Sequence, residues 1–503
     1  MIISYDLGTG GNKASLFDTD GIEIVSVFEF YETFYPGSGR HEQRPADWWN
    51  AVVRSTHRLL SEAKKQGINS EQITCLAISG HSLGCVPLDT DGNVLRQTTP
   101  IWSDRRAEAE AAAFFEHFDP DEWYMRTGNG FPAAHYTLFK ILWYKNNEPE
   151  IFAKTAKIAG TKDYINYCLT GVLATDYSYA SGLGAYRLTD WAYDEELIRL
   201  SGLSPALFPK IVPATEILGS LKIQAAEELG LSPQTLIAAG GVDNSCMALG
   251  AGSFQSGRLY ASLGSSSWIA VSDSKPLLDV RLKPYVFTHV VPEQFASALA
   301  IFSSGTTFRW VRDQLCRDLL AQADREQSDV YELMIAEAEQ SPPGANGVLF
   351  NPTLGGGSAL DPGPNIRGAF LGLDLSHTRS DLIRAAMEGI ALNLRIVLDA
   401  FRKLSRVQSR MNVVGGGAKS RFWRQIYADV LQMEIEKTNI GQEAAALGAA
   451  ALAAVGTGLW NDFSPIDAVL TMEDRQVPQK QLIEQYADLF IRFQQDAQWL
   501  AQR

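Results

Sequence analysis

Residues 2–17 read IISYDLGTGGNKASLF, and residues 259–273 read LYASLGSSSWIAVSD. Each stretch has two runs of strand-forming residues separated by a turn of small residues, at Gly8–Asn12 and at Gly264–Ser267. One hairpin opens the chain and the other opens its second half. This repetition predicts two domains of related architecture, with a boundary near Gly250–Gly257.

The length and composition of the chain agree with two globular domains. The chain has 503 residues, which is too long for one ordinary hydrophobic core. Apolar residues make up 46% and charged residues 20%, as is typical of globular proteins. We therefore expect an N-terminal domain of residues 1–248 and a C-terminal domain of residues 249–503.

The charge and the cysteines exclude several classes of protein. A formal net charge of -14 argues against binding a nucleic-acid backbone, which depends on clustered Lys and Arg, but it does not exclude a nucleotide. The N-terminus has no basic leader, and no apolar run is long enough to span a bilayer. We expect a cytoplasmic protein with no nucleic-acid or membrane partner, for which a homodimer is one possible assembly. The cysteines are odd in number and lack CxxC spacing, which favours reduced thiols: Cys75, Cys85, Cys168, Cys246 and Cys316.

The second half of the chain contains an α/β unit. A helix is predicted over Asp381–Lys403 from apolar residues at helical spacing, and a strand follows at Met411–Val414. A glycine-rich turn at residues 415–420 then leads into a helix at Arg421–Gln432. Glu443–Val455 is predicted to be a helix of small residues that allows close approach of a backbone or a ligand. The order of these elements predicts an α/β fold.

Turns rich in glycine or hydroxyl residues follow several predicted strands. None matches the Walker A loop or the GxGxxG dinucleotide pattern. A single turn of this kind is more often only a turn. In combination the turns suit phosphate, which is held by backbone N–H groups and hydroxyls where the backbone admits close approach.

Asp6 and Lys13 flank the first of these turns. An acid two residues before a Gly-Thr turn can hold a magnesium ion beside phosphates, and it can equally cap the turn. Lys13 can neutralise phosphate charge, although a solvated hairpin lysine is the commoner case.

Asp243 follows an apolar strand at Leu236–Gly241 and precedes Asn244. An acid at a strand end beside small residues is placed to face a cleft, where ligands of α/β sheets bind. In phosphoryl transfer such a carboxylate accepts the proton of the attacking hydroxyl. The same residue also suits the N-cap of a following helix, and the local sequence does not decide between the two.

Four further polar residues are weaker candidates for contacts with a sugar. His81 follows an apolar strand, where a structural histidine is the commoner case. Asp104, with Arg105 and Arg106, can hydrogen-bond a polyol or form a surface ion pair.

Taken in order, these segments resemble the FGGY carbohydrate kinases, and the xylulokinase-like branch in particular. The resemblance runs from Ile2 to about Gly458. Its motifs are Asp6-Leu7-Gly8-Thr9 with Lys13, Trp102-Ser103-Asp104-Arg105-Arg106, Gly241-Val242-Asp243-Asn244, Leu263-Gly264-Ser265-Ser266 and Gly415-Gly416-Gly417-Ala418-Lys419-Ser420. The C-terminal signature of the family is met by Gly368–Leu373 followed, after seven residues, by Asp381-Leu382 and Ala385–Glu388. The N-terminal signature, around Thr137, Lys140 and Trp143, is met except at its first position, where His135 stands.

The resemblance implies two ribonuclease H-like domains, of the type found in actin and hexokinase, flanking a cleft for ATP and Mg²⁺. It implies that Asp243 is the catalytic base and that Asp6 is the acid on the metal side, with the sugar mainly on the N-terminal domain. The substrate-binding residues would be His81, Ser82, Asp104, Arg106, Asp243 and Asn244. The ATP-binding residues would be Gly8, Thr9, Gly10, Lys13, Gly264, Ser265, Ser266, Gly416, Gly417 and Ser420.

Two segments depart from the family pattern and leave the sugar open. Xylulokinases carry Gln-Met-His-Gly where this chain has Gly80–Gly84, so their substrate histidine falls on Leu83, and His81 is the candidate replacement. The family's Gly-Glu-Arg-Thr-Pro segment is replaced by Leu354–Pro362. Xylulose, another ketopentose, a hexose acid and a polyol all fit.

The expected reaction transfers the γ-phosphoryl group of ATP to a sugar hydroxyl, with domain closure excluding water. It requires Asp243 and the turns of both halves to meet at one gap. Two rivals stay open at this point. One is a conformational ATPase of the actin or heat-shock-chaperone type, and the other is a sugar-binding regulatory protein without turnover.

Overall fold

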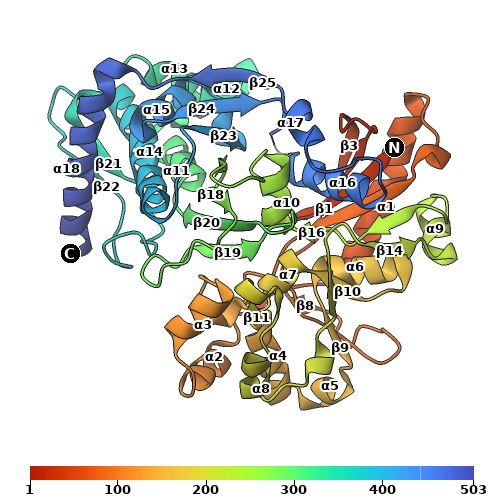
Figure 1. Cartoon of the computed structure of the whole chain (residues 1–503). Coiled ribbons are helices and arrows are strands. Elements are labelled where there is room, and N and C mark those ends of the chain that lie inside the picture. Colours follow the sequence, from red (N-terminus) through yellow and green to blue (C-terminus); the bar gives the residue numbers. More distant parts are fainter. Residues whose placement is uncertain (442) are drawn as a thin grey trace. The chain divides into compact units, whose positions relative to one another are not determined.

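The computed structural model describes residues 1–441 and 443–503, and the chain divides into two compact units. Both units are of the α/β type (Figure 1). Unit 1 comprises Met1–Ser256, Ser272–Ser297 and Glu443–Leu470. Unit 2 comprises Gly257–Val271, Ala298–Gln442 and Thr471–Arg503. Each unit is therefore assembled from segments far apart in the sequence, while the expected boundary between residues 248 and 249 stays a prediction.

The main sheet of unit 1 has the strand order β14-β15-β6-β1-β2-β3, and β16 pairs with β6. The central strand β1 is almost entirely buried, as its run of apolar residues predicts, and it pairs in antiparallel fashion with β2 and in parallel with β6. The bounds are β1 Ile2–Leu7, β2 Gly11–Phe17, β3 Glu23–Phe30, β6 Cys75–Gly80, β14 Ile217–Ser220, β15 Leu236–Ala238 and β16 Gly241–Val242.

Helices cover this sheet. Helix α1 (Pro45–Lys65) begins with Pro45, whose fixed φ suits a first helical turn, and buries Trp48, Val52 and Leu59 on one face. It packs on β2 and β3, while α16 (Ala444–Gly456) packs on β1 and β6. The other helices of unit 1 are α2 Glu108–Phe115, α3 Pro120–Thr127, α4 Thr137–Asn147, α5 Pro149–Lys154, α6 Thr161–Thr170, α7 Tyr177–Ser181, α8 Glu195–Ser201, α9 Ile223–Leu229, α10 Asp243–Gly250 and α17 Pro465–Val469.

Helices α10 and α16 approach so closely that glycine is required at their crossing. A Cβ atom added at Gly250 would lie 1.8 Å from Ala444 O, and one added at Gly448 would lie 2.0 Å from Cys246 O. The small-residue helix expected over residues 443–455 is thus confirmed, and its small residues serve helix packing.

Unit 1 also contains short strands outside the main sheet. They are β4 Phe34–Gly37, β5 Arg40–Gln43, β7 Val86–Leu88, β8 Thr99–Pro100, β9 Lys157–Ala159, β10 Ala174–Asp176, β11 Tyr186–Arg187, β12 Ala192–Tyr193, β13 Lys210–Val212 and β19 Tyr285–Thr288.

The sheet of unit 2 runs in the order β20-β18-β17-β23-β24-β25. The antiparallel hairpin of β17 and β18 and the parallel pairing of β17 with β23 repeat the relation of β1 to β2 and β6 in unit 1. The repetition seen in the sequence therefore corresponds to a repeated arrangement of strands. The bounds are β17 Leu259–Leu263, β18 Ser267–Asp273, β20 Phe295–Ile301, β21 Leu349–Asn351, β22 Ala369–Leu371, β23 Arg410–Val414, β24 Glu434–Thr438 and β25 Met472–Gln476.

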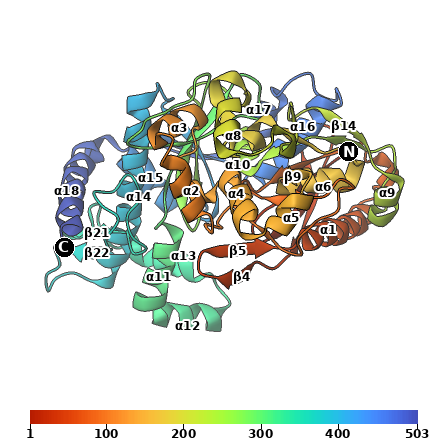
Figure 2. The ribbon, with the colours of Figure 1, turned by 90° about the horizontal axis from the view of Figure 1, so that it is seen from below.

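The long helix of unit 2, α14 (Arg379–Leu404), begins with a capping box in which Thr378 and Asp381 satisfy each other's backbone N–H groups. Figures 1 and 2 both show α18 beside β21 and β22. The remaining helices are α11 Gly305–Leu315, α12 Arg317–Glu326, α13 Val330–Ala338, α15 Arg421–Leu431 and α18 Ile483–Ala501. Within the described residues, none of the helices is both long and apolar enough to cross a bilayer.

Candidate active site

Two carboxylates of unit 1 lie at the same edge of its main sheet. Asp6 is on β1, directly opposite Ser79 of the parallel strand β6, and the Ser79 hydroxyl donates to Asp6 Oδ1 (2.8 Å). Strand β16 pairs in parallel with β6 and leads directly into Asp243. Because the carboxyl ends of parallel strands meet at one edge of a sheet, the fold brings Asp6 and Asp243 together.

The electrostatics of this pair suit proton transfer near neutral pH. Burial, and then the negative charge of Asp6, raise the pKa of Asp243 from 3.8 to about 7. Burial also raises the pKa of Asp6, although the Ser79 hydroxyl and the charge of Lys13 act in the opposite direction. Poor hydration next to a like charge is the usual way in which a carboxyl group becomes a base at neutral pH.

The same pair of carboxylates fits a magnesium ion. Mg²⁺ prefers oxygen ligands and is commonly held by one or two carboxylates, with water and phosphate completing its shell. Within residues 1–441 and 443–503 no group of three or more His, Cys, Asp or Glu side chains is arranged for a metal. The role of Asp6 beside a metal ion therefore stays a prediction.

Asp243 is the first residue of α10, and Val242 occupies the N-cap position. Its Oδ1 atom accepts a hydrogen bond from the adjacent Asn244 N (2.8 Å). The alternative that Asp243 serves as the N-cap is therefore wrong. Its side chain is only partly enclosed, as is that of Asn244.

A buried polar network holds the backbone immediately before Asp243. The Val242 N–H donates to the Ser178 hydroxyl (3.0 Å), which itself donates to Asp176. Asp176 in turn forms an ion pair with Lys162 (2.9 Å). Lys162 and Asn166 both donate to the carbonyl of Ala239, at 3.3 and 2.8 Å. Hydrogen bonds to the N–H of Val242 and to the carbonyl of Ala239 thus fix the backbone segment that leads into Asp243.

The first glycine-rich turn joins β1 and β2. Gly8 N donates to Gly11 O (3.0 Å), and Thr9 and Gly10 are exposed. The Thr9 hydroxyl accepts from Trp102 Nε1 (2.8 Å), which brings two of the expected motifs together. Lys13 stands opposite Asp6 on the neighbouring strand and forms an ion pair with Glu443 (3.0 Å).

Asp104 and Arg106 lie in a buried ion-pair cluster. Asp104 is fully buried and accepts from His41 N (2.7 Å) and from the Arg106 guanidinium (2.7 and 2.9 Å). Arg106 also contacts Glu42 at 2.6 Å. These hydrogen bonds lie within the protein, which favours a structural role, and the expected contact with a sugar stays a prediction.

His81 and Ser82 follow β6 and have different surroundings. His81 is 1% exposed, its ring packs edge-on against Trp48, and burial lowers its pKa to about 4. Its Nδ1 atom lies 3.4 Å from the Thr161 hydroxyl. Ser82 is 8% exposed, and its side chain forms no hydrogen bond with the described residues. Ser82 is thus the better placed of the two to meet a ligand, and both sugar contacts stay predictions.

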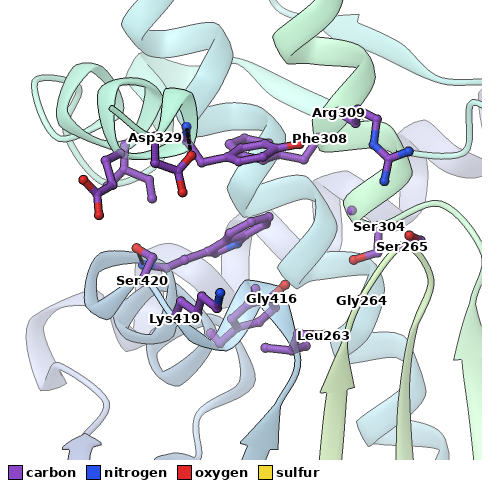
Figure 3. A pocket seen from close by; sticks show the side chains of 17 residues that line it. Leu263, Gly264, Ser265, Ser304, Phe308, Arg309, Asp329, Gly416, Lys419 and Ser420 are labelled. Carbon is purple, nitrogen blue, oxygen red and sulfur yellow. Dashed lines mark hydrogen bonds between the residues drawn. The ribbon is translucent and has the colours of Figure 1, made fainter. Parts of the chain in front are cut away.

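Unit 2 contains a pocket of about 550 Å³. Figure 3 shows Phe308, Arg309 and Asp329 on one side of it and Gly416, Lys419 and Ser420 on the other. Its lining combines backbone-exposing glycines, aromatic rings and a few charged groups, as ligand pockets usually do. The lining residues are Leu263, Gly264, Ser265, Ser304, Gly305, Phe308, Arg309, Asp329, Tyr331, Glu332, Ile335, Gly416, Gly417, Lys419, Ser420, Trp423 and Tyr427.

The neighbouring glycines of this pocket differ in the space beside them. A Cβ atom added at Gly416 would meet no other atom within 4 Å, whereas one at Gly417 would lie 3.0 Å from Leu263 Cβ. The Ser420 hydroxyl caps α15 by accepting from Trp423 N (3.1 Å). The pocket therefore brings together Gly416, Gly417 and Ser420.

The turn between β17 and β18 also contributes to the lining, through Gly264 and Ser265. Gly264 N donates to Ser266 O (3.1 Å), which closes the turn. The carbonyls of Gly264 and Ser265 accept from the first N–H groups of α11, Gly305 N and Thr306 N, at 3.0 Å each. The turn is thereby fixed to the start of α11 by the first two N–H groups of that helix.

Sequence reasoning missed the aromatic wall of this pocket. Phe308 and Trp423 have ring centroids 4.7 Å apart, and Trp423 stacks on Tyr427 at 5.8 Å. Tyr331 stacks on Phe308 from α13. The spacing of Trp423 and Tyr427, four residues apart on a predicted helix, was the available signal, but Phe308 and Tyr331 come from helices whose packing no local pattern indicates.

Comparisons with known proteins agree with this arrangement. Residues 1–250 match the model for the FGGY family of carbohydrate kinases, N-terminal domain, and residues 259–457 match that for its C-terminal domain. The xylulose kinase of Bacillus subtilis (strain 168) is 30% identical over 490 residues, covering 97% of this chain and 95% of the relative. The gluconokinase of Bacillus licheniformis is 30% identical over 495 residues, covering 98% and 94%. The crystal structure of ligand-bound xylulose kinase from Lactobacillus acidophilus is 26% identical with a TM-score of 0.89, covering 99% of this chain and 98% of that one.

Proposed function

Because the chain belongs to the FGGY family of carbohydrate kinases, we propose that it transfers the γ-phosphoryl group of ATP to a hydroxyl of a small sugar, with a ketopentose such as xylulose as the first candidate acceptor. Asp243 is the base in this proposal, and Asp6 is the acid beside the metal. The observation that carries it is the raised pKa of Asp243, about 7, next to a second carboxylate at the edge of the unit 1 sheet.

The pocket of unit 2 supports the assignment of a nucleotide. Its aromatic rings provide flat surfaces for a base, and Gly416 leaves the backbone open to close approach. The Gly264–Ser266 turn would meet the phosphates, as would Gly8, Thr9, Gly10 and Lys13 in unit 1. Magnesium, when bound at the carboxylates, would neutralise charge on the transferring phosphoryl group.

The chemistry assigned to the chain's own residues is limited to proton transfer and positioning. Asp243 takes the proton of the acceptor hydroxyl as the oxygen–phosphorus bond forms. The Ser178–Asp176–Lys162 network holds the backbone on which Asp243 stands. Asn244, partly enclosed next to Asp243, is proposed to contact the sugar, as are His81, Ser82, Asp104 and Arg106.

The experiment that tests this function is a screen of ketoses, aldoses, polyols and sugar acids by coupled ADP production. We expect acceptor-dependent ADP release, with D-xylulose among the active sugars. ADP release that is independent of every sugar would instead support a conformational ATPase. Sugar binding in a calorimeter without turnover would support a regulatory protein.

A sugar acid is the second candidate acceptor. A gluconokinase matches the chain as well as a xylulose kinase does, at 30% identity in each case. D-gluconate and D-xylulose differ in charge and in carbon number. The screen compares the two as acceptors and so decides between them. Preference for D-gluconate by a factor of ~10 or more in kcat/KM would replace the ketopentose proposal.

A further inference from the structure

The N-terminal signature of the family has no part in the chemistry assigned above, although the structure gives its residues a clear geometric role. Two of them, Thr137 and Lys140, lie with Tyr144 on one face of α4, at positions i, i+3 and i+7. Each side chain is buried, and each donates a hydrogen bond to a backbone carbonyl outside the helix.

The three acceptors are consecutive residues of one segment. Lys140 Nζ donates to Leu83 O (3.0 Å), the Thr137 hydroxyl to Gly84 O (3.2 Å) and the Tyr144 hydroxyl to Cys85 O (3.1 Å). A regular strand alternates the directions of successive residues, so three consecutive carbonyls facing one helix require an irregular backbone. Leu83 provides the irregularity with φ at 60°, in the left-handed region that a bulky residue rarely adopts.

The same segment is held from another side by the hydroxyl of Tyr179. This hydroxyl donates to His81 O (3.1 Å) and accepts from Gly84 N (3.3 Å). Ser82 therefore lies between two tethered points of the backbone, and its own side chain forms no hydrogen bond within the described part of the chain.

Lys140 also joins this segment to a second one. Its ammonium group donates to Ile101 O (2.7 Å), immediately before Trp102. Trp102 in turn contacts the Thr9 hydroxyl (2.8 Å), and its carbonyl accepts from His135 Nδ1 (3.1 Å). One buried cation thus links the segment that presents Ser82 to the segment that reaches the first glycine-rich turn.

An ammonium group is an unusual choice for this position. Lys140 is fully buried, and burial lowers its pKa to about 8 in spite of the nearby charge of Asp104. A buried cation is costly, and a hydrogen bond from a charged donor to a carbonyl is stronger than one from a neutral donor. Lys140 therefore fixes the loop at Leu83 and the loop at Ile101 relative to each other, and its burial lowers the free energy of unfolding.

We propose that α4 is a positioning element for the acceptor site, in which Lys140, assisted by Thr137 and Tyr144, fixes the backbone of Leu83–Cys85 and of Ile101 so that Ser82 and Trp102 face the sugar. This inference rests on the proposed function for its last step, but the fixing of the two loops is independent of it. These three residues are positioning residues and do not themselves contact the substrate.

The test uses the full-length protein with Lys140→Met, which keeps an unbranched side chain one atom shorter and removes its donors. We expect hydrogen–deuterium exchange in peptides covering residues 81–88 and 100–104 to accelerate at least about tenfold, with little change elsewhere in unit 1. Lys145→Met is the matched control, because Lys145 lies on the same helix and donates to Gly202 O (3.0 Å), in a different loop. An unchanged rate at residues 81–88, or equal acceleration across unit 1, would overturn the proposal.

Kinetics give the second measurement, with D-xylulose and D-gluconate as the acceptors. We expect Lys140→Met to raise the KM for the acceptor at least about tenfold while leaving ADP affinity unchanged, and Lys140→Arg to restore part of the loss. If the wild-type protein phosphorylates neither sugar, the proposed acceptors fail, and the exchange result still decides whether α4 fixes the loops. Should Lys140→Met not fold, Thr137→Val and Tyr144→Phe test the same loop, each with a smaller effect.

Discussion

The carboxylate edge of unit 1 and the aromatic pocket of unit 2 are built by opposite means. Around Asp6 and Asp243 the surroundings are polar, and a charged network with two buried ion pairs of Lys162 fixes the backbone before Asp243. The unit 2 pocket has few charges, and aromatic packing and glycines define its shape. The difference teaches that two similar hairpin-and-strand arrangements can carry different sites, and the proposed function assigns proton chemistry to the first and a flat ligand to the second.

The largest expected effect belongs to the carboxylate edge. Asp243→Asn should lower kcat at least ~10²-fold, because it removes the group that takes the proton of the acceptor hydroxyl. Steady-state kinetics with the active sugar measure this loss, and calorimetry with ADP should show unchanged nucleotide affinity. A variant with full activity would remove Asp243 from the mechanism.

The same variant provides its own control for folding. The folded-state pKa of Asp243 lies above its unfolded value of 3.8, so ionising the side chain costs stability as the pH rises from about 4 through 7. The Asp243→Asn substitution removes that cost, and thermal unfolding at pH 8 should therefore occur at an equal or higher temperature than in the wild type. Lower stability together with lost activity would indicate a damaged fold instead of a missing base.

The second prediction concerns the aromatic pocket. Gly416→Leu should weaken ADP binding by about 30-fold, or ~2 kcal/mol, because the new side chain enters the space in which a Cβ meets no other atom. Calorimetry with ADP measures the loss, and the melting temperature should not change.

Gly415→Ala is the contrasting variant at the neighbouring position. Gly415 has φ at 95°, and an added Cβ would lie 2.8 Å from Leu263 O, so this change should lower stability. If both variants behaved alike, the division of roles between the two glycines would be wrong.

The third prediction is a dependence of the rate on pH. Since the pKa of Asp243 is raised to about 7, the residue is mostly ionised at pH 8 and mostly protonated at pH 6. We expect kcat/KM for the acceptor to fall about tenfold from pH 8 to pH 6, because only the carboxylate accepts a proton. ADP affinity, measured at the same two pH values, should change far less, since no histidine or cysteine lines the aromatic pocket within the described residues. A flat rate profile would contradict the assignment of the base.

The smallest expected effect tests the network behind the base. Ser178→Ala removes the acceptor of the Val242 N–H, and we expect kcat to fall about fivefold with unchanged ADP affinity, as a less ordered base would cause. Ser181→Ala is the control, because this buried serine of the same helix accepts from Thr288 N instead. Equal losses in both variants would indicate a general effect on α7.

The sequence allows the repeated part of the fold to be predicted, because the repetition is local. The hairpins at residues 2–17 and 259–273 are visible as apolar runs around small-residue turns, and the structure confirms them as β1–β2 and β17–β18. The helix expected over Asp381–Lys403 is α14, Arg379–Leu404, two residues longer at its start because a capping box begins at Thr378.

The candidate site is less accessible to sequence reasoning where it depends on packing. The strand expected over Leu236–Gly241 is divided into β15 and β16, because Gly240 adopts φ of 71° against the carbonyl of Ile78. The pair Gly240-Gly241 was the available signal for this break, which lies three residues before Asp243. By contrast, the buried state of Asp104 follows from its contacts with His41 and Arg106, which a list of polar residues does not reveal.

The crossing of α10 and α16 has a consequence for biosynthesis. Gly250 and Gly448 meet across nearly two hundred intervening residues, and α16 also packs on the central strand β1. During synthesis the hydrophobic core of unit 1 therefore lacks α16 until almost the whole chain has been translated. Fragments that stop near residue 250 will expose that apolar surface to water and to chaperones, however complete they look as a stretch of sequence.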